Sequence, residues 1–184
     1  MSITTCLICA CVALLILVVY NTAAIIQFGP LASLSNTYYY YENKKKGLGW
    51  LFRVMMWTMA GTLLPAALEL SDAVSSWSTN FTFLIFFGIA AIAFVGAAPD
   101  FRSSKLENAV HMSSAGIAAA ACLLWCAIVC WKLMYIIPIW LVVCWGIAFL
   151  SKTNKSMRDW WWEMVAFGAT YTTIIVQSIL LLNA

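Results

Sequence analysis

The sequence predicts an all-α, polytopic membrane protein, a bundle of six transmembrane helices whose N- and C-termini are both extracytoplasmic. Three observations predict this fold class. Hydrophobic residues make up 64% of the 184 residues and charged residues only 9%, and the mean hydropathy is +0.92, which excludes an ordinary soluble domain. The apolar residues form stretches close to the roughly 20 residues that cross a bilayer as a helix. Finally, the basic residues are concentrated on alternate connections, which predicts the orientation.

The six predicted segments form a single transmembrane domain. The first is too long for the apolar region of a signal peptide and lacks a basic start. The second begins near Trp50 and contains Pro65, which should kink it. The third and fifth are the shortest, the fourth is rich in Ala and Gly, and the sixth begins with a tryptophan triplet suited to the membrane interface. The segments are 3–27, 49–70, 81–98, 110–131, 133–150 and 160–182.

The basic residues predict which side of the membrane each connection faces. Of the ten Lys and Arg residues, only Lys132 lies outside the first, third and fifth connections and their flanks. The positive-inside rule places those connections in the cytosol and the chain in the inner (plasma) membrane. Because topology explains the net charge of +3, no nucleic-acid partner is expected; membrane lipid is the expected partner, and a homo-oligomer is left open. The residues are Lys44, Lys45, Lys46, Arg53, Arg102, Lys105, Lys152, Lys155 and Arg158.

Small residues predict how the helices pack. The third and fourth segments carry several Gly, Ala and Ser residues, which let helices approach closely in lipid, so we expect these two to be tightly apposed. The first and fifth, rich in Leu, Ile and Val, should face lipid more. The seven cysteines are interpreted as small apolar packing residues. With a single His in the chain, we expect no metal site and no cofactor.

Polar and ionisable residues gather on the predicted cytosolic side. An ionisable group near a helix end in a membrane is costly unless it is paired or functional. We expect these residues to line a pocket for a lipid head group or another small amphiphile, where a cation holds an anionic group and hydroxyls orient it. The alternative is that they only fix loops to helix ends. The predicted site residues are Ser33, Ser35, Tyr38, Tyr39, Arg53, Asp100 and His111.

Two further polar patterns lie deeper in the segments. Glu69 belongs to a polar stripe on the second segment, and Glu163, Thr170 and Gln177 recur every seven residues on the sixth. Helical geometry places each set on one face. Such stripes supply hydrogen bonds between helices, or they line a polar path, which would indicate a transporter or a proton-linked permeation path.

A serine-type lipid hydrolase is the third possibility. Ser33 or Ser35 together with His111 and Asp100 would supply a nucleophile and a base. No nucleophile-elbow pattern accompanies them, and a single His excludes the three-histidine zinc mechanism of membrane hydrolases of the ceramidase and adiponectin-receptor type. We therefore expect binding rather than catalysis and assign no catalytic residue.

One motif carries a resemblance. Ser33-Leu34-Ser35-Asn36-Thr37-Tyr38-Tyr39 follows the first segment, Arg53 lies in the second, and His111-Met112-Ser113-Ser114-Ala115 opens the fourth. Together they resemble small bacterial six-helix membrane proteins that are distantly similar to the DRAM/Frag-type superfamily. The resemblance implies a six-helix fold and not a particular reaction.

Overall fold

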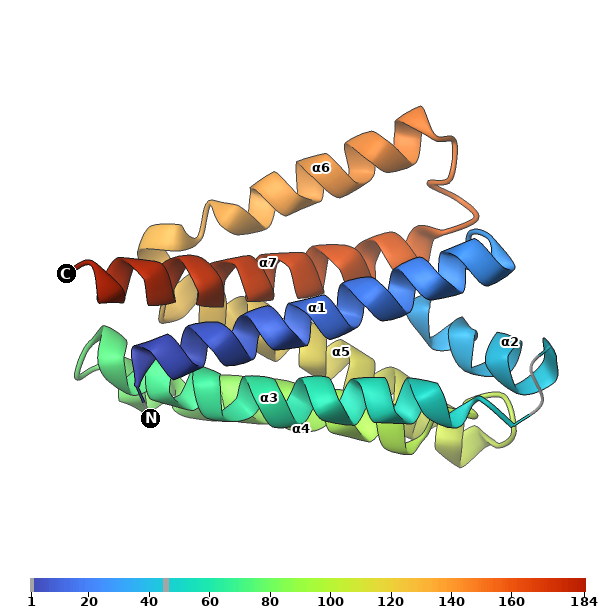
Figure 1. The fold of residues 1–184 in the computed structure, drawn as a ribbon, viewed down its shortest axis with the longest axis horizontal. Helices are drawn as coiled ribbons and strands as arrows, with labels where there is room; N and C mark the ends of the chain where they lie inside the picture. Colours follow the sequence, from blue (N-terminus) through green and yellow to red (C-terminus); the bar gives the residue numbers. More distant parts are fainter. Residues whose placement is uncertain (1, 45–46) are drawn as a thin grey trace.

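The computed structural model describes residues 2–44 and 47–184, and every regular element in these ranges is helical (Figure 1). Six of the helical segments are long and apolar enough to cross a membrane, which confirms the all-α prediction and fits a multi-pass membrane protein. The long helices are α1 (Ile3–Phe28), α3 (Trp50–Val74), α4 (Thr82–Ala97), α5 (Lys105–Ile128), α6 (Ile136–Leu150) and α7 (Arg158–Leu182). The third and fifth candidate spans, Ser78–Ala97 and Trp131–Leu150, also include the short turns that precede α4 and α6. The short ones are η1 (Leu34–Asn36), α2 (Thr37–Lys44), η2 (Ser78–Phe81) and η3 (Trp131–Leu133).

The predicted boundaries differ most where a helix contains polar residues. The fourth segment was expected to begin at 110, but α5 begins at Lys105, because the Ser104 hydroxyl caps it by accepting the Glu107 N–H at 3.1 Å. α3 likewise continues to Val74, beyond the predicted end at 70. α2 lies within the first connection and has no counterpart among the predicted segments. Hydrophobicity locates membrane-length segments and does not detect these polar turns.

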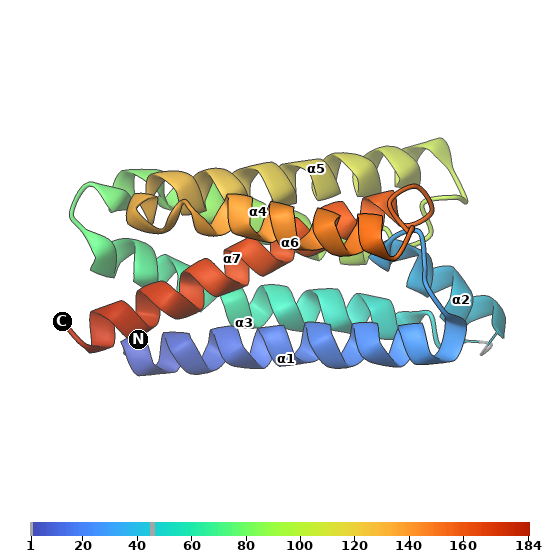
Figure 2. The ribbon, with the colours of Figure 1, turned by 90° about the horizontal axis from the view of Figure 1, so that it is seen from above.

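Both termini lie at one end of the bundle, and the charged connections lie at the other (Figures 1 and 2). We call the second end the basic end; it comprises the described parts of the connections, residues 29–44, 47–49, 98–104 and 151–157. The described basic residues other than Lys132 belong to these connections or to the first turns beside them. Lys45 and Lys46, part of the predicted lysine cluster, lie outside the described residues.

α4 and α5 pack closely, as the small residues predict. A Cβ atom on Gly88 of α4 would lie 2.6 Å from the Cys122 sulfur and 3.1 Å from its backbone nitrogen. Cys122 is buried and packs at this contact. The backbone of α4 at Gly88 therefore lies directly against Cys122 of α5, and this cysteine acts as a small apolar packing residue.

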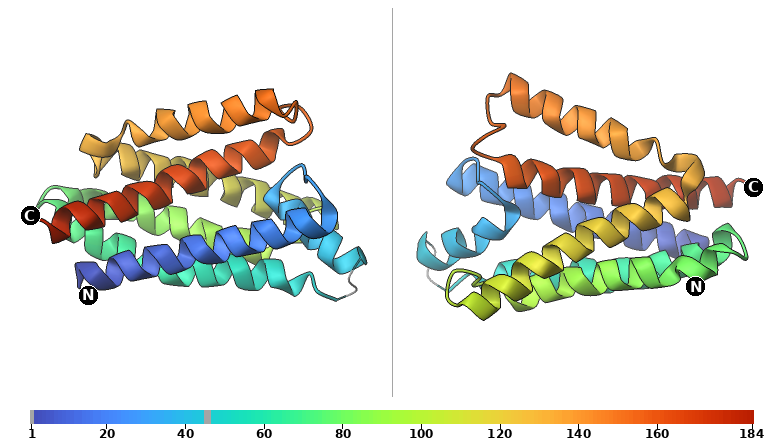
Figure 3. Two further views of the ribbon diagram at one scale, coloured as in Figure 1. Left: turned by 45° about the horizontal axis from the view of Figure 1, so that its top comes forward. Right: turned by 180° about the vertical axis from the view of Figure 1, so that it is seen from behind.

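α6 is held mainly by α7 and diverges from the other helices toward the basic end (Figure 3). The Trp140 ring of α6 lies over Gly168 of α7, where a Cβ would be 2.6 Å from ring atoms. The indole N–H of Trp140 also donates to the Thr172 hydroxyl at 3.0 Å. α1 and α6 are the least buried of the long helices, which confirms the expectation that the first and fifth segments are the most exposed.

Gly168→Val is expected to destabilise the packing of α6 on α7 by about 1–3 kcal/mol, because the branched side chain must displace the Trp140 ring. The matched control is Gly146→Val on α6, where a Cβ meets nothing within 4 Å. Both variants replace Gly by Val within a helix, so the change in helix propensity is the same. Thermal unfolding in detergent, followed by tryptophan fluorescence, measures both. Equal unfolding temperatures for the two variants would contradict the proposed contact.

Candidate functional site

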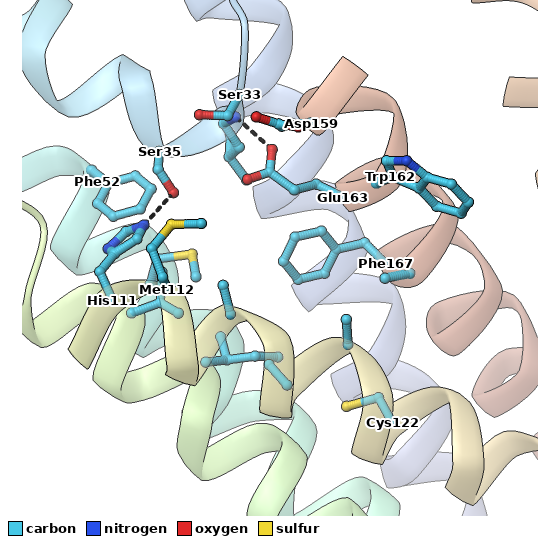
Figure 4. Close-up of a pocket in the computed structure, with 18 of the residues that line it drawn as sticks. Ser33, Ser35, Phe52, His111, Met112, Cys122, Asp159, Trp162, Glu163 and Phe167 are labelled. Carbon is cyan, nitrogen blue, oxygen red and sulfur yellow. Dashed lines mark hydrogen bonds between the residues drawn. The ribbon is translucent and has the colours of Figure 1, made fainter. Parts of the chain in front are cut away.

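A cavity of about 410 Å³ lies in the half of the bundle nearest the basic end (Figure 4). It is enclosed by α3, α4, α5, α7 and the loop that contains η1, and its volume falls within the range of small-molecule sites. Its polar lining comes mainly from the basic end: Ser33, Ser35, Asn36, Arg102, His111, Asp159 and Glu163. Its apolar lining lies farther along the helices and includes Leu63, Ile89, Ala118, Cys122, Phe167 and Tyr171.

The polar and apolar parts are separated along the bundle axis. On α7, the lining extends from Asp159 to Tyr171, and on α5 from His111 to Cys122. At 1.5 Å per helical residue these intervals correspond to roughly 18 and 16 Å. The cavity therefore has the form expected for an amphiphile, with a polar end at the connections and an apolar end within the bundle.

Ser35 and His111 form a buried pair in the cavity wall. The Ser35 hydroxyl oxygen lies 2.9 Å from Nε2 of His111, and Nδ1 of the same ring lies 2.8 Å from the Ala98 carbonyl oxygen. Because a carbonyl oxygen only accepts, Nδ1 carries a proton, and in the neutral ring Nε2 accepts from the Ser35 hydroxyl. Both side chains are less than 10% exposed, so the loop is fixed to α5 by this hydrogen bond.

The same loop is fixed to α7 by Glu163. The Leu34 backbone N–H donates to the Glu163 carboxyl group at 2.6 Å, and the Trp160 N–H donates to the Ala32 carbonyl oxygen at 3.0 Å. Ser33 caps the 3₁₀ turn η1 by accepting the Asn36 N–H. The loop is thus held on both sides and closes the basic end of the cavity.

Arg102 is the arginine in the cavity lining. Its Nη2 donates to the Asn36 side-chain oxygen at 2.6 Å, and its guanidinium lies 4.4 Å from the centroid of the Tyr39 ring. Tyr39 in turn accepts the Arg102 backbone N–H at 2.7 Å. Arg102 is therefore oriented by an amide and an aromatic face while it remains exposed.

The predicted site residues divide into two groups. Ser33, Ser35 and His111 line the cavity. The other four, which the structure does not include in the lining, lie beside it: Tyr38, Tyr39, Arg53 and Asp100. They form a neighbouring cluster, in which burial, followed by the Asp100 carboxylate, raises the pKa of Tyr38.

Tyr39 belongs to the same cluster. Its burial, together with hydrogen bonding to Asp100, raises its pKa to about 12. Arg53 is exposed and lies next to Tyr38. The cation at the cavity is therefore Arg102, in the connection after the third predicted segment, and not Arg53 of the second segment. In the sequence, the signal for Arg102 was its position close to Asp100 in that connection.

The two predicted polar stripes lie only partly in the cavity lining. Glu163 and Thr170 line the cavity, whereas Glu69 and Gln177 are not in the lining and lie farther toward the termini. The Thr170 hydroxyl donates to the Ala166 carbonyl oxygen of its own helix at 2.8 Å. The four residues therefore do not border one common cavity.

Tyr171 is a lining residue that the sequence pattern did not single out. Its side chain is 1% exposed, and its hydroxyl has no hydrogen-bond partner within residues 2–44 and 47–184. A buried hydroxyl without a partner costs about 1–3 kcal/mol. The Tyr171 hydroxyl is therefore an unsatisfied polar group in the otherwise apolar part of the cavity wall.

The exposure of two lining side chains indicates that the cavity opens at the side of the bundle. Two of its lining side chains, Met112 on α5 and Trp162 on α7, are 60% and 51% exposed on the surface of the bundle. Figure 4 shows Met112 on α5 and Trp162 on α7. The apolar surroundings of the opening suit the entry of a hydrophobic chain.

Comparison with family models, curated proteins and solved structures found no match. The resemblance to DRAM/Frag-type proteins therefore stays a prediction. Among the described residues, no group of three or more His, Cys, Asp or Glu is placed to hold a metal ion.

Proposed function

We propose that the protein is a multi-pass protein of the inner (plasma) membrane whose basic end faces the cytosol, and that it binds a membrane lipid or a similar amphiphile in the cavity. The observation that carries the proposal is one continuous cavity that joins an Arg102-containing polar end to an apolar interior. The two exposed side chains in its lining, Met112 and Trp162, support it by indicating a lateral opening. Positive-inside placement supports the orientation.

The polar end favours a head group that contains both charge and donors. Arg102 binds an anionic group, for which a guanidinium is well suited. Asp159 and Glu163 line the same end and accept hydrogen bonds from amine or hydroxyl groups of the ligand. The head group is therefore a phosphate ester with polar substituents, and the chain occupies the space between Leu63, Phe167 and Tyr171.

Arg102→Ala is expected to weaken the binding of decyl phosphate about tenfold, because a charge-assisted hydrogen bond is worth about 1.5–3 kcal/mol. Binding of decyl glucoside, which has no charge, should change much less. Native mass spectrometry of the purified protein, titrated with each amphiphile, measures both affinities.

Arg53→Ala is the matched control, because Arg53 lies near the same end but is not part of the cavity lining. It should leave both affinities unchanged. Equal effects of the two substitutions on decyl phosphate, or no binding of either amphiphile to the unmodified protein, would refute the proposed site.

A further inference from the structure

We propose that the cavity also hydrolyses its ligand: Ser35 is a nucleophile and His111 its general base in the cleavage of a long-chain carboxylic ester. This inference rests on the proposed function, because the ester must occupy the amphiphile cavity. It is carried by the 2.9 Å contact between the Ser35 hydroxyl and Nε2 of His111 within the cavity wall. A hydroxyl becomes a competent nucleophile when a positioned base accepts its proton.

His111 is oriented as a base requires. The Ala98 carbonyl accepts the Nδ1 proton at 2.8 Å, so the neutral ring presents its lone pair on Nε2 to Ser35. In serine hydrolases an aspartate usually has this orienting role; here the backbone carbonyl of Ala98 is the positioning group, and Asp100 does not line the cavity. The Phe101 ring lies against the imidazole with centroids 4.6 Å apart and limits its rotation.

The ester is placed by the two ends of the cavity. Its acyl chain lies in the apolar part and its head group contacts Arg102, so the carbonyl carbon lies between them, at the level of Ser35. Asn36, the next residue in the chain, also lines the cavity, and its side-chain oxygen is held by Arg102. The Asn36 amide and the Arg102 guanidinium are the donors that stabilise the oxyanion formed during attack.

The reaction uses only the ester and water. The Ser35 oxygen bonds to the carbonyl carbon while its proton passes to Nε2 of His111. The carbon–oxygen bond to the alcohol then breaks, and the departing oxygen receives that proton. Water, which reaches the polar end beside the exposed Arg102 and Asp159, gives a proton to Nε2 and attacks the acyl carbon. Ser35 leaves with the proton, and the products are a fatty acid and an alcohol.

The test uses a decyl-chain fluorophosphonate and p-nitrophenyl decanoate with the purified full-length protein in lipid nanodiscs. We expect one covalent adduct per protein, mapped by peptide mass spectrometry to Ser35, and release of p-nitrophenolate. Ser35→Ala and His111→Gln should each lower hydrolysis at least about 100-fold, and the double variant should lose no more than either single variant, because a nucleophile and its base act as a unit.

Ser113→Ala is the matched control, because Ser113 is exposed on α5 outside the cavity lining and its hydroxyl donates to the Ala109 carbonyl oxygen of its own helix. It should keep both the adduct and the activity. Mapping the adduct on the unmodified protein tests Ser35 even where a variant does not fold.

The outcomes separate this inference from the binding proposal. Decyl phosphate binding without an adduct on Ser35, or hydrolysis that persists in folded Ser35→Ala, overturns the hydrolase and leaves the binding site intact. In that case the Ser35–His111 hydrogen bond serves only to hold the loop. Absence of both binding and adduct overturns the cavity function itself.

Discussion

Ala119→Trp is expected to abolish amphiphile binding, with a loss of at least about 100-fold in affinity for decyl phosphate, or roughly 2.7 kcal/mol. Ala119 lies on α5 in the lining of the cavity. An indole at this position would fill the space proposed for the acyl chain. Native mass spectrometry with decyl phosphate and with decyl glucoside should show the same loss, because the substitution removes volume rather than charge.

The neighbouring Ala120 provides a close control. It is exposed on α5 and is not among the lining residues, so Ala120→Trp adds the same side chain outside the cavity. This variant should bind both amphiphiles like the unmodified protein. Equal losses in the two variants, with unchanged helical content by circular dichroism, would show that the amphiphile binds elsewhere.

Gly88→Val is expected to cause the largest loss of stability among single substitutions at the helix contacts, about 3 kcal/mol or more, at the upper end of the range for overpacking. The new side chain would meet both the sulfur and the backbone nitrogen of Cys122. The sulfur can rotate away, but the backbone cannot, so α4 and α5 must separate. Since Cys122 also lines the cavity, binding of decyl phosphate should weaken with the fold.

Gly116→Val on α5 is the control for Gly88→Val, because a Cβ at Gly116 meets nothing within 4 Å. Thermal unfolding in the same detergent compares the two. Gly88→Val should unfold at a temperature well below that of the control, and a shared unfolding temperature would refute the close contact between α4 and α5.

The helical architecture could be predicted because it depends on one strong signal. Long apolar segments and small-residue faces are visible in the sequence, and α4 and α5 meet at Gly88 as those faces predict. α2 and the first turn of α5 could not be predicted in this way, because their residues are polar and their helicity depends on capping and local contacts.

The candidate site was predictable only in part. Ser33, Ser35 and His111 were identified by residue type and by their common side of the membrane. Arg53 and Arg102 look alike at that level, and which of them reaches the cavity is decided by the loop conformation that places Arg102 beside Asn36 and Tyr39. The Tyr171 hydroxyl has no hydrogen-bond partner among the described residues, and the sequence carries no signal for this because it results from three-dimensional packing.

The sideways opening between Met112 and Trp162 has a kinetic consequence. In a bilayer, a ligand arriving through it diffuses in two dimensions and never crosses water. The rate of binding should then follow the mole fraction of the ligand among the surrounding lipids. Dilution with inert lipid at a constant total amount of ligand should slow binding, whereas dilution with buffer should leave the rate unchanged for a ligand that stays in the membrane.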